Sequence, residues 1–181
     1  SQTLGLAGNW NALARRARGE RIVIIGDDDR LLPEFLSTLV PHARRGFDVT
    51  FSNHFVIDAD GAHLAGETAR WTRKYRREEL PLGPISHPER AVWRNSVPMS
   101  ASLIRTAALV DLKFNEELNT PEIEFFLRLA RRGGQFFFCP ESLMEFRTHP
   151  ASATSGGLWN DRLARRLLAL PPSPDCETDQ R

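Results

Sequence analysis

Lysine is scarce in this chain of 181 residues, and Lys74 and Lys113 are its only lysines. Arginine therefore carries almost all of the positive charge, and 24 basic residues against 23 acidic ones leave a net charge of +1. The planar guanidinium of arginine suits the recognition of phosphate groups. A general nucleic-acid binder carries a marked positive excess, so we expect no nucleic-acid partner.

Cysteine is equally scarce, since Cys139 and Cys176 are the only two. Cys139 lies in an apolar run and Cys176 in a polar tail, which predicts neither a disulfide nor a zinc site and fits a reducing compartment. No apolar run approaches the length that spans a bilayer, and the first residues do not form a signal-peptide pattern. We therefore expect a cytoplasmic protein that is at most peripheral at the inner membrane face.

The composition, 41% hydrophobic and 26% charged, is ordinary for a globular protein. The length suits one domain with a proper core, which we place at residues 1–170. The proline-rich segment 171–181 predicts a disordered tail. We find no internal repeat.

The chain is organised around an apolar segment that runs into three carboxylates. Residues 22–25 are all β-branched, which predicts a strand over 21–26 that is buried on both faces, as in a parallel sheet flanked by helices. Asp27, Asp28 and Asp29 follow at the carboxyl end, the edge where open α/β sheets bind ligands. Three adjacent carboxylates repel one another, and a divalent metal would neutralise them. The alternative is a solvated turn in which one aspartate caps the next helix.

Helix and strand patterns along the rest of the chain predict a mixed α/β sheet. The expected helices cover 9–17 with Asn9 as cap, 33–45 with an apolar face of Phe35, Leu36, Leu39 and Val40, 106–111, a segment that starts at Pro121, and a basic amphipathic segment over 158–170. The expected strands cover 47–57, 97–104, 135–138 and 143–147, with a turn at 58–61 that folds 63–65 back as a hairpin. Residues 66–90 predict a long surface loop with a short helix.

The order of these motifs resembles the family 2 glycosyltransferases over residues 5–155. The matching pieces are Gly8-Asn9-Trp10-Asn11 before a helix that ends at 17–20, the acidic triplet with Pro33 behind it, the turn at 57–61, Phe114-Asn115-Glu116-Glu117-Leu118, Glu122 ahead of 127–130, and Phe146-Arg147-Thr148-His149. Each piece alone is weak evidence. Their order and spacing together are fairly specific.

The resemblance implies a GT-A fold, which is a Rossmann-like mixed sheet flanked by helices. It also implies a nucleotide-sugar donor and a divalent metal, Mn²⁺ or Mg²⁺. In the family the first strands, which carry much of the nucleotide pocket, lie upstream of the helix that opens here. We therefore expect an N-terminally truncated form of the fold.

The same resemblance assigns roles to individual residues. Alignment through the following proline makes Asp28 the first metal ligand, with Asp29 to assist and His149 as a third ligand. The expected donor contacts are Asp27 at the ribose, Arg147 at the diphosphate, Asn9, and Trp159 in a segment that closes over the donor. The competing hypothesis is that His149 is a surface loop residue and that Trp159 merely packs a tail.

The expected catalytic base comes from the helix that starts at Pro121. In an inverting transfer a carboxylate removes the proton of the acceptor hydroxyl. Alignment through Arg128 places Glu122 where the family has aspartate, which makes Glu122 the expected base and Glu124 the second candidate. A carboxylate in the first helical turn also gains from the helix dipole, so its presence does not require a catalytic role.

The implied function is transfer of a hexose from a UDP- or GDP-sugar to the hydroxyl of a carbohydrate or lipid-linked acceptor, as in bacterial polysaccharide or glycolipid synthesis. Arg162, Arg165 and Arg166 in the segment 158–170 fit either a contact with a membrane surface or a solvated face. Two other hypotheses remain open. One is a non-catalytic GT-A-like binding module, and the other is a phosphoreceiver domain that would use Asp58 and Lys113.

Overall fold

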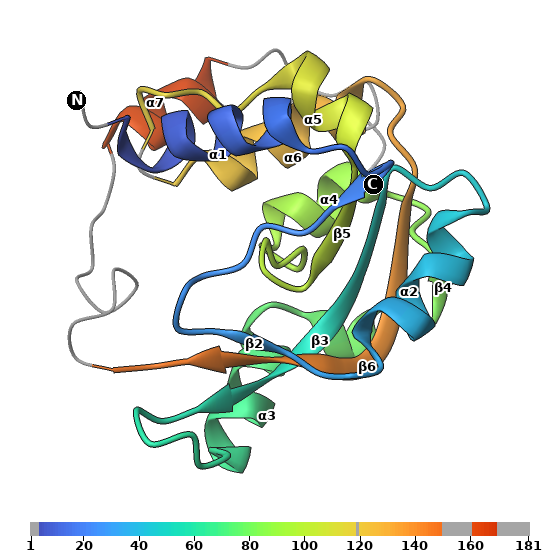
Figure 1. The fold of residues 1–181 in the computed structure, drawn as a ribbon, viewed down its shortest axis with the longest axis vertical. Coiled ribbons are helices and arrows are strands. Elements are labelled where there is room, and N and C mark those ends of the chain that lie inside the picture. The colour runs from blue at the N-terminus through green and yellow to red at the C-terminus, as the bar shows by residue number, and fades with distance from the viewer. Residues whose placement is uncertain (1–3, 119, 150–160, 170–181) are drawn as a thin grey trace, which may run out of the picture.

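A computed structural model describes residues 4–118, 120–149 and 161–169. Its strands form one mixed sheet in the order β1-β5-β3-β6-β2, with β4 paired to β6 (Figure 1). The strands are β1 (Arg21–Ile22), β2 (Arg30–Leu31), β3 (Val49–Ile57), β4 (Gly83–Pro84), β5 (Ser102–Arg105) and β6 (Phe136–Arg147). The helices are α1 (Gly5–Arg16), α2 (Phe35–Ala43), α3 (Ala65–Lys74), the 3₁₀ helix η1 (Arg77–Glu79), α4 (Pro88–Trp93), α5 (Thr106–Leu112), α6 (Pro121–Arg131) and α7 (Asp161–Leu168).

The two long strands β3 and β6 form the centre of the sheet and run parallel, from Val49 beside Phe136 to Ile57 beside Arg147. The other strand pairs are antiparallel. The register of the central pair shifts near Asn53, whose side-chain Nδ2 donates a 2.8 Å hydrogen bond to the carbonyl of Pro140. Proline has no backbone N–H to donate to a ladder, which is consistent with an irregular register at this point.

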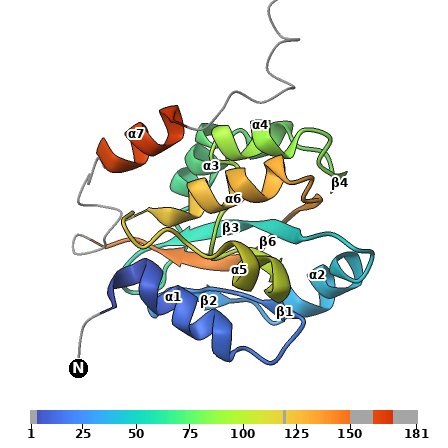
Figure 2. The same cartoon turned by 90° about the horizontal axis from the view of Figure 1, so that it is seen from above.

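Side chains of the sheet alternate between two apolar clusters, one on each face. The larger cluster contains Phe51 and Phe138 together with residues of α1, α4, α5 and α6. The smaller cluster contains Leu103 and Cys139 beneath α2. Figure 1 shows α1, α5, α6 and α7 at one end of the molecule, and Figure 2 shows α2 at the opposite side of the view from α7. The mixed α/β sheet flanked by helices is therefore confirmed.

The predicted strand over 21–26 is wrong, because only Arg21 and Ile22 pair, and they pair antiparallel with β5. Beyond Ile22 the apolar segment leaves the sheet and crosses between the two clusters. Val23 packs against the smaller cluster, Ile24 is buried in the larger one, and Ile25 is 38% exposed. The successive β-branched residues are therefore apolar because they pack into two different clusters, and not because they form a strand buried on both faces.

Other predicted boundaries also change. The segment 66–90 is not a long loop, because it contains α3, η1 and β4 and leads into α4. The strand expected over 97–104 is reduced to β5, and the two strands expected over 135–147 are one, β6. In the predicted apolar face of α2, Phe35 and Leu39 are buried, whereas Leu36 is 53% exposed. The turn at 58–61 is confirmed, since Ile57 forms a bridge with His63.

The predicted cap of the first helix is also wrong, because α1 begins at Gly5 and Asn9 lies inside it. The helix predicted over 106–111 and the one that starts at Pro121 are confirmed as α5 and α6. The predicted tail 171–181 and Cys176 lie outside the described residues. Within the described ranges no helix combines the length and apolar composition needed to cross a membrane.

Candidate functional site

A cavity of about 550 Å³, called the central cavity below, collects most of the residues singled out in the sequence. The three aspartates at 27–29, called the acidic turn below, line it together with Glu122, Arg147 and His149. These residues come from the loop after β1, from the first turn of α6 and from the end of β6. Further lining comes from Leu6 and Trp10 of α1, from the loop 95–100, and from β3, α3 and η1.

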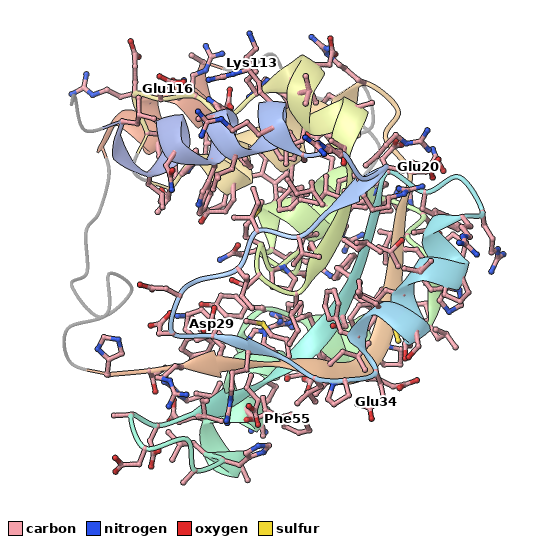
Figure 3. All side chains as sticks on the ribbon, in the orientation of Figure 1. Glu20, Asp29, Glu34, Phe55, Lys113 and Glu116 are labelled. Atoms are coloured by element: carbon pink, nitrogen blue, oxygen red, sulfur yellow. The ribbon has the colours of Figure 1, made fainter. Side chains whose placement is uncertain are left out.

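The acidic turn is fastened to the end of β6 by Arg147. The backbone N–H of Arg147 donates to Asp29 Oδ1 at 3.0 Å, and its Nε donates to the carbonyl of Asp28 at 2.9 Å. Its Nη1 donates to the carbonyls of Asp58 and Ala59 at 2.8 and 2.9 Å. Figure 3 shows Asp29 beside β6. Arg147 thus joins three segments of the chain, and its expected contact with a diphosphate stays a prediction.

Gly26 allows this turn to close tightly. A Cβ at position 26 would lie 2.8 Å from Asp28 Oδ1 and 3.2 Å from Asp29 Oδ2, distances at which a side chain must displace its neighbours. Burial raises the pKa of the Asp29 carboxyl, and the nearby charge of Asp28 raises it further. The hydrogen bond from the Arg147 backbone lowers it, but the net pKa is still raised. Asp29 therefore serves chiefly to hold the turn in place.

The predicted metal ligands Asp28 and His149 do lie together. His149 Nε2 is 3.2 Å from Asp28 Oδ2, and both side chains are about one-third exposed to the cavity side. Asp29, the third candidate, turns one oxygen to the Arg147 backbone. Among the described residues no group of three or more histidine, cysteine, aspartate or glutamate side chains is placed to hold a metal ion.

This donor set fits a particular kind of metal binding. Mg²⁺ usually keeps several waters and takes only one or two protein carboxylates, with substrate phosphates supplying other oxygens. Asp28 supplies a carboxylate of the kind that such a shared site uses, and Asp28 with His149 does not form a complete cage. The metal assignment itself stays a prediction.

Glu122 and Glu124 have different surroundings although both lie in the first turn of α6. Glu122 lines the central cavity, and burial raises the pKa of its carboxyl. Glu124 is 1% exposed, does not line the cavity, and forms ion pairs with Arg128 at 2.8 Å and with Arg166 at 3.3 Å. The geometry favours Glu122 as the candidate base and gives Glu124 a contact between α6 and α7.

The remaining sequence candidates lie elsewhere. Asp27 is exposed at the cavity, whereas Asn9 is exposed on α1 and does not line it. Its neighbour Asn11 is buried and exchanges hydrogen bonds with the backbone of Phe114. Trp159 lies outside the described residues. Of the basic residues on α7, Arg165 and Arg166 are exposed, and the side chain of Arg162 is outside the described part of the structure.

The residues required by the phosphoreceiver hypothesis do not form a site. Asp58 Oδ1 accepts hydrogen bonds from the backbone N–H groups of Asp60 and Ala62 and so caps a turn. Lys113 follows α5, and Figure 3 shows it at the helical end of the molecule, away from Asp29. Neither residue lines the central cavity.

One wall of the cavity was missed by sequence reasoning. His54, Trp71, Tyr75 and Arg77, called the Arg77 wall below, come from β3, α3 and η1. Arg77 is 2% exposed and donates from Nη1 to His54 Nδ1 at 3.0 Å. The available signal was His54 within β3, a strand that also contains Thr50, Ser52 and Asn53. Arg77 had no local signal, because its segment has no clear periodicity.

The sequence model described as Glycosyl transferase family 2 matches residues 1–97. The chain belongs to glycosyl transferase family 2. The match runs from α1 through the acidic turn to the start of the loop 95–100, and so includes the acidic turn and the Arg77 wall. No curated protein sequence matches this family 2 chain.

Two solved structures of a bacterial protein share the fold. The crystal structure of S. aureus TarS 1-349 in complex with UDP-GlcNAc gives a TM-score of 0.64 at 14% identity, over 88% of this chain and 43% of that one. The crystal structure of S. aureus TarS 1-349 alone gives 0.57 at 17% identity, over 81% and 41%. At these identities the likeness establishes a GT-A-like fold. The family 2 chain spans less than half of the length of these neighbours.

Proposed function

We propose that this chain carries the metal-binding and general-base side of a glycosyltransferase that uses a nucleotide-sugar donor. The observation that supports the proposal is the central cavity, which brings the acidic turn, His149 and Glu122 to one space from segments far apart in the sequence. Membership of glycosyl transferase family 2 supplies the reaction class.

The proposed reaction is an inverting transfer. An acceptor hydroxyl attacks the anomeric carbon of the sugar, the bond from that carbon to the diphosphate oxygen breaks, and the proton passes to the carboxylate of Glu122. A carboxyl whose pKa is raised by burial is a better proton acceptor once it is ionised. Asp28 and His149 hold a divalent cation, which when bound offsets charge on the departing diphosphate.

The donor and acceptor are proposed at the level of class. One solved neighbour of the same fold is described in complex with UDP-GlcNAc, which favours a UDP-sugar among nucleotide-sugar donors. Asp27 is exposed at the cavity, and we assign it to the contact with the ribose. The acceptor is a carbohydrate or lipid-linked hydroxyl, as in bacterial polysaccharide or glycolipid synthesis.

Calorimetric titration with Mn²⁺ and UDP tests the proposal. We expect saturable binding of UDP that depends on the metal. Asp28→Asn should abolish most Mn²⁺ binding because it removes one of the two available protein ligands. Asp27→Asn should leave Mn²⁺ affinity unchanged and weaken UDP binding.

Failure of UDP to bind the wild-type protein, with or without Mn²⁺, contradicts the proposal. Binding of Mn²⁺ and UDP without transfer or donor hydrolysis would instead favour a non-catalytic GT-A-like binding module. Equal loss of Mn²⁺ binding in both variants would show that the acidic turn acts through its summed charge and not through Asp28.

A further inference from the structure

The Arg77 wall contains a buried positive charge that no described carboxylate balances. The guanidinium of Arg77 has no acidic partner among the contacts that the structure describes, and its Cζ lies 5.3 Å from the centre of the Tyr75 ring. Burial lowers the pKa of Arg77 to about 10, so the group still carries its charge at neutral pH. A buried cation without a counter-charge is costly, and such a group attracts an anion.

The hydrogen bonding of the wall selects the same kind of ligand. Arginine can only donate, so His54 Nδ1 must accept the bond from Arg77 and His54 Nε2 must carry the ring proton. Burial, with a further contribution from Arg77, lowers the pKa of His54 to about 3, so the ring is neutral. His54 Nε2 and Arg77 Nε are both buried without a hydrogen-bond partner in the described structure. The two unpaired N–H donors and the positive charge of Arg77 match a ligand whose oxygen atoms carry negative charge.

The wall is built for a fixed position in the cavity. Phe146 contacts the rings of His54 and Trp71, with centroids 5.8 and 5.2 Å apart, and the next residue, Arg147, holds the acidic turn. Arg76 precedes η1 in the left-handed region with φ of 54°, which sets the direction in which Arg77 enters the wall. The wall and the acidic turn are therefore both attached to the end of β6, through the adjacent residues Phe146 and Arg147.

We propose that the Arg77 wall is an anion-binding subsite, which takes a phosphate or carboxylate group carried by the acceptor. This inference rests on the proposed function for its acceptor, because the acidic turn with its metal is assigned to the diphosphate of the donor. The guanidinium turns its unused N–H toward the anion on binding, and the neutral His54 ring donates from Nε2. Trp71 and Tyr75 exclude water around the pair.

Titration with inorganic phosphate in the absence of divalent metal tests the subsite itself. Without metal the acidic turn repels phosphate, so binding reports on the Arg77 wall. We expect saturable binding to the wild-type protein and a loss of affinity of about tenfold or more in Arg77→Gln, the size expected for one charge-assisted hydrogen bond. Arg70→Gln is the matched control, because Arg70 is an exposed arginine of α3 that pairs with Glu67.

A second titration distinguishes an anion of the acceptor from the diphosphate of the donor as the ligand of the Arg77 wall. Phosphate is titrated again in the presence of saturating Mg²⁺ and UDP, and its affinity should be unchanged, because UDP occupies the acidic turn. Arg77→Lys, which keeps the charge and loses the planar fork, should bind phosphate with intermediate affinity, and thermal unfolding of each variant establishes that it is folded.

The outcomes are distinct. No phosphate binding to the folded wild-type protein, or equal binding to Arg77→Gln, overturns the subsite. Displacement of phosphate by Mg²⁺ and UDP overturns the assignment to the acceptor, because Arg77 would then hold the donor diphosphate. If UDP does not bind at all, the proposed function fails, whereas phosphate binding that is lost in Arg77→Gln still supports an anion subsite.

Discussion

Glu122 has a carboxyl in the wall of the central cavity, where loss of water favours its neutral form and raises its pKa. A general base works only when it is ionised. The raised pKa therefore sets the acidic limb of the expected rate profile above the ordinary range of a glutamate. A side chain that merely caps a helix would have no such limb.

Glu122→Gln should lower the rate of sugar transfer by about 10²- to 10⁴-fold, because the acceptor hydroxyl loses its base. The residual rate should no longer fall as pH decreases through the raised pKa of Glu122. Steady-state kinetics across the pH range measure both effects. Glu117→Gln, at an exposed position just before α6, is the control and should behave as wild type. Near-normal turnover in Glu122→Gln would remove Glu122 from the mechanism.

His54 gives the molecule a pH-dependent stability. Its pKa is lowered from 6.5 to about 3, first by burial and then by the charge of Arg77. Between these values the unfolded chain binds a proton that the folded chain excludes, so stability is present above pH 6.5 and is lost as the pH falls toward 3.

Urea unfolding between pH 4 and pH 7 should show this loss, with a slope from His54 of about 1.4 kcal/mol per pH unit. His54→Gln should reduce the slope, because glutamine takes up no proton in either state. His87→Gln, at an exposed position before α4, should leave the slope unchanged. A slope that is the same in wild type and His54→Gln would show that other groups govern acid unfolding.

At the scale of elements, α6 combines two carboxylates with opposite effects on stability. Glu122 has no cationic partner among the contacts described for it and loses hydration, so its ionised form opposes folding. Glu124 lies between Arg128 on α6 and Arg166 on α7, and its charge is compensated by both. One helix thus holds the carboxylate that we propose as the general base and a second carboxylate that joins α6 to α7.

Glutamine substitutions should separate the two roles. Glu124→Gln should lower the free energy of unfolding by roughly 1–3 kcal/mol, because two arginines lose a buried partner. Glu122→Gln should raise it or leave it unchanged at neutral pH. The raised pKa means that the stability contributed by Glu122 is fully present below its unfolded pKa near 4.5 and is lost as pH rises through the folded pKa. Thermal unfolding at pH 4.5 and pH 7.5 measures the difference. A fall in stability for both variants would contradict the assignment.

The sequence allowed α6 and the acidic turn to be predicted because their signals are local. Pro121 starts the helix, and three adjacent aspartates mark a turn whatever packs around them. The sequence did not allow β1 to be predicted correctly. Val23 and Ile24, which follow Ile22, are apolar because they pack into two different clusters formed by distant parts of the chain. The partnership of His54 with Arg77 depends on how α3 and η1 pack against β3, which no local pattern encodes.

At the scale of the whole molecule, the two sides of the central cavity differ. On the side of the acidic turn, the lining consists mainly of loops. Residues 24–29 and 97–100 connect elements and line the cavity, whereas α2 packs against the smaller cluster. Ligands that bind the folded state stabilise it through the groups they contact. Ordering should therefore be confined to the loops.

Hydrogen exchange with and without Mn²⁺ and UDP tests this. We expect slower amide exchange at 23–29 and around His149 when both ligands are present, and no change in α2. The helix α2 is an internal control because it lies outside the cavity lining. Uniform protection of loops and α2 alike would indicate global stabilisation without a local site, and no protection anywhere would contradict binding in the central cavity.

The parallel pairing of β3 and β6 has a consequence for the order of folding. Val49 pairs with Phe136, and Arg21 pairs with Arg105, so the central strand and the strand before the acidic turn both await partners made much later in the chain. Such distant pairings slow folding, because the entropy of closing a long loop is lost before the stabilising contacts between the strands form. During synthesis β3, with Val49, Phe51, Val56 and Ile57 fully buried in the native state, has no β6 to cover it. The newly made chain is therefore most prone to aggregation before residues 136–147 emerge, and a chaperone that binds apolar extended segments would act on β3 during that interval.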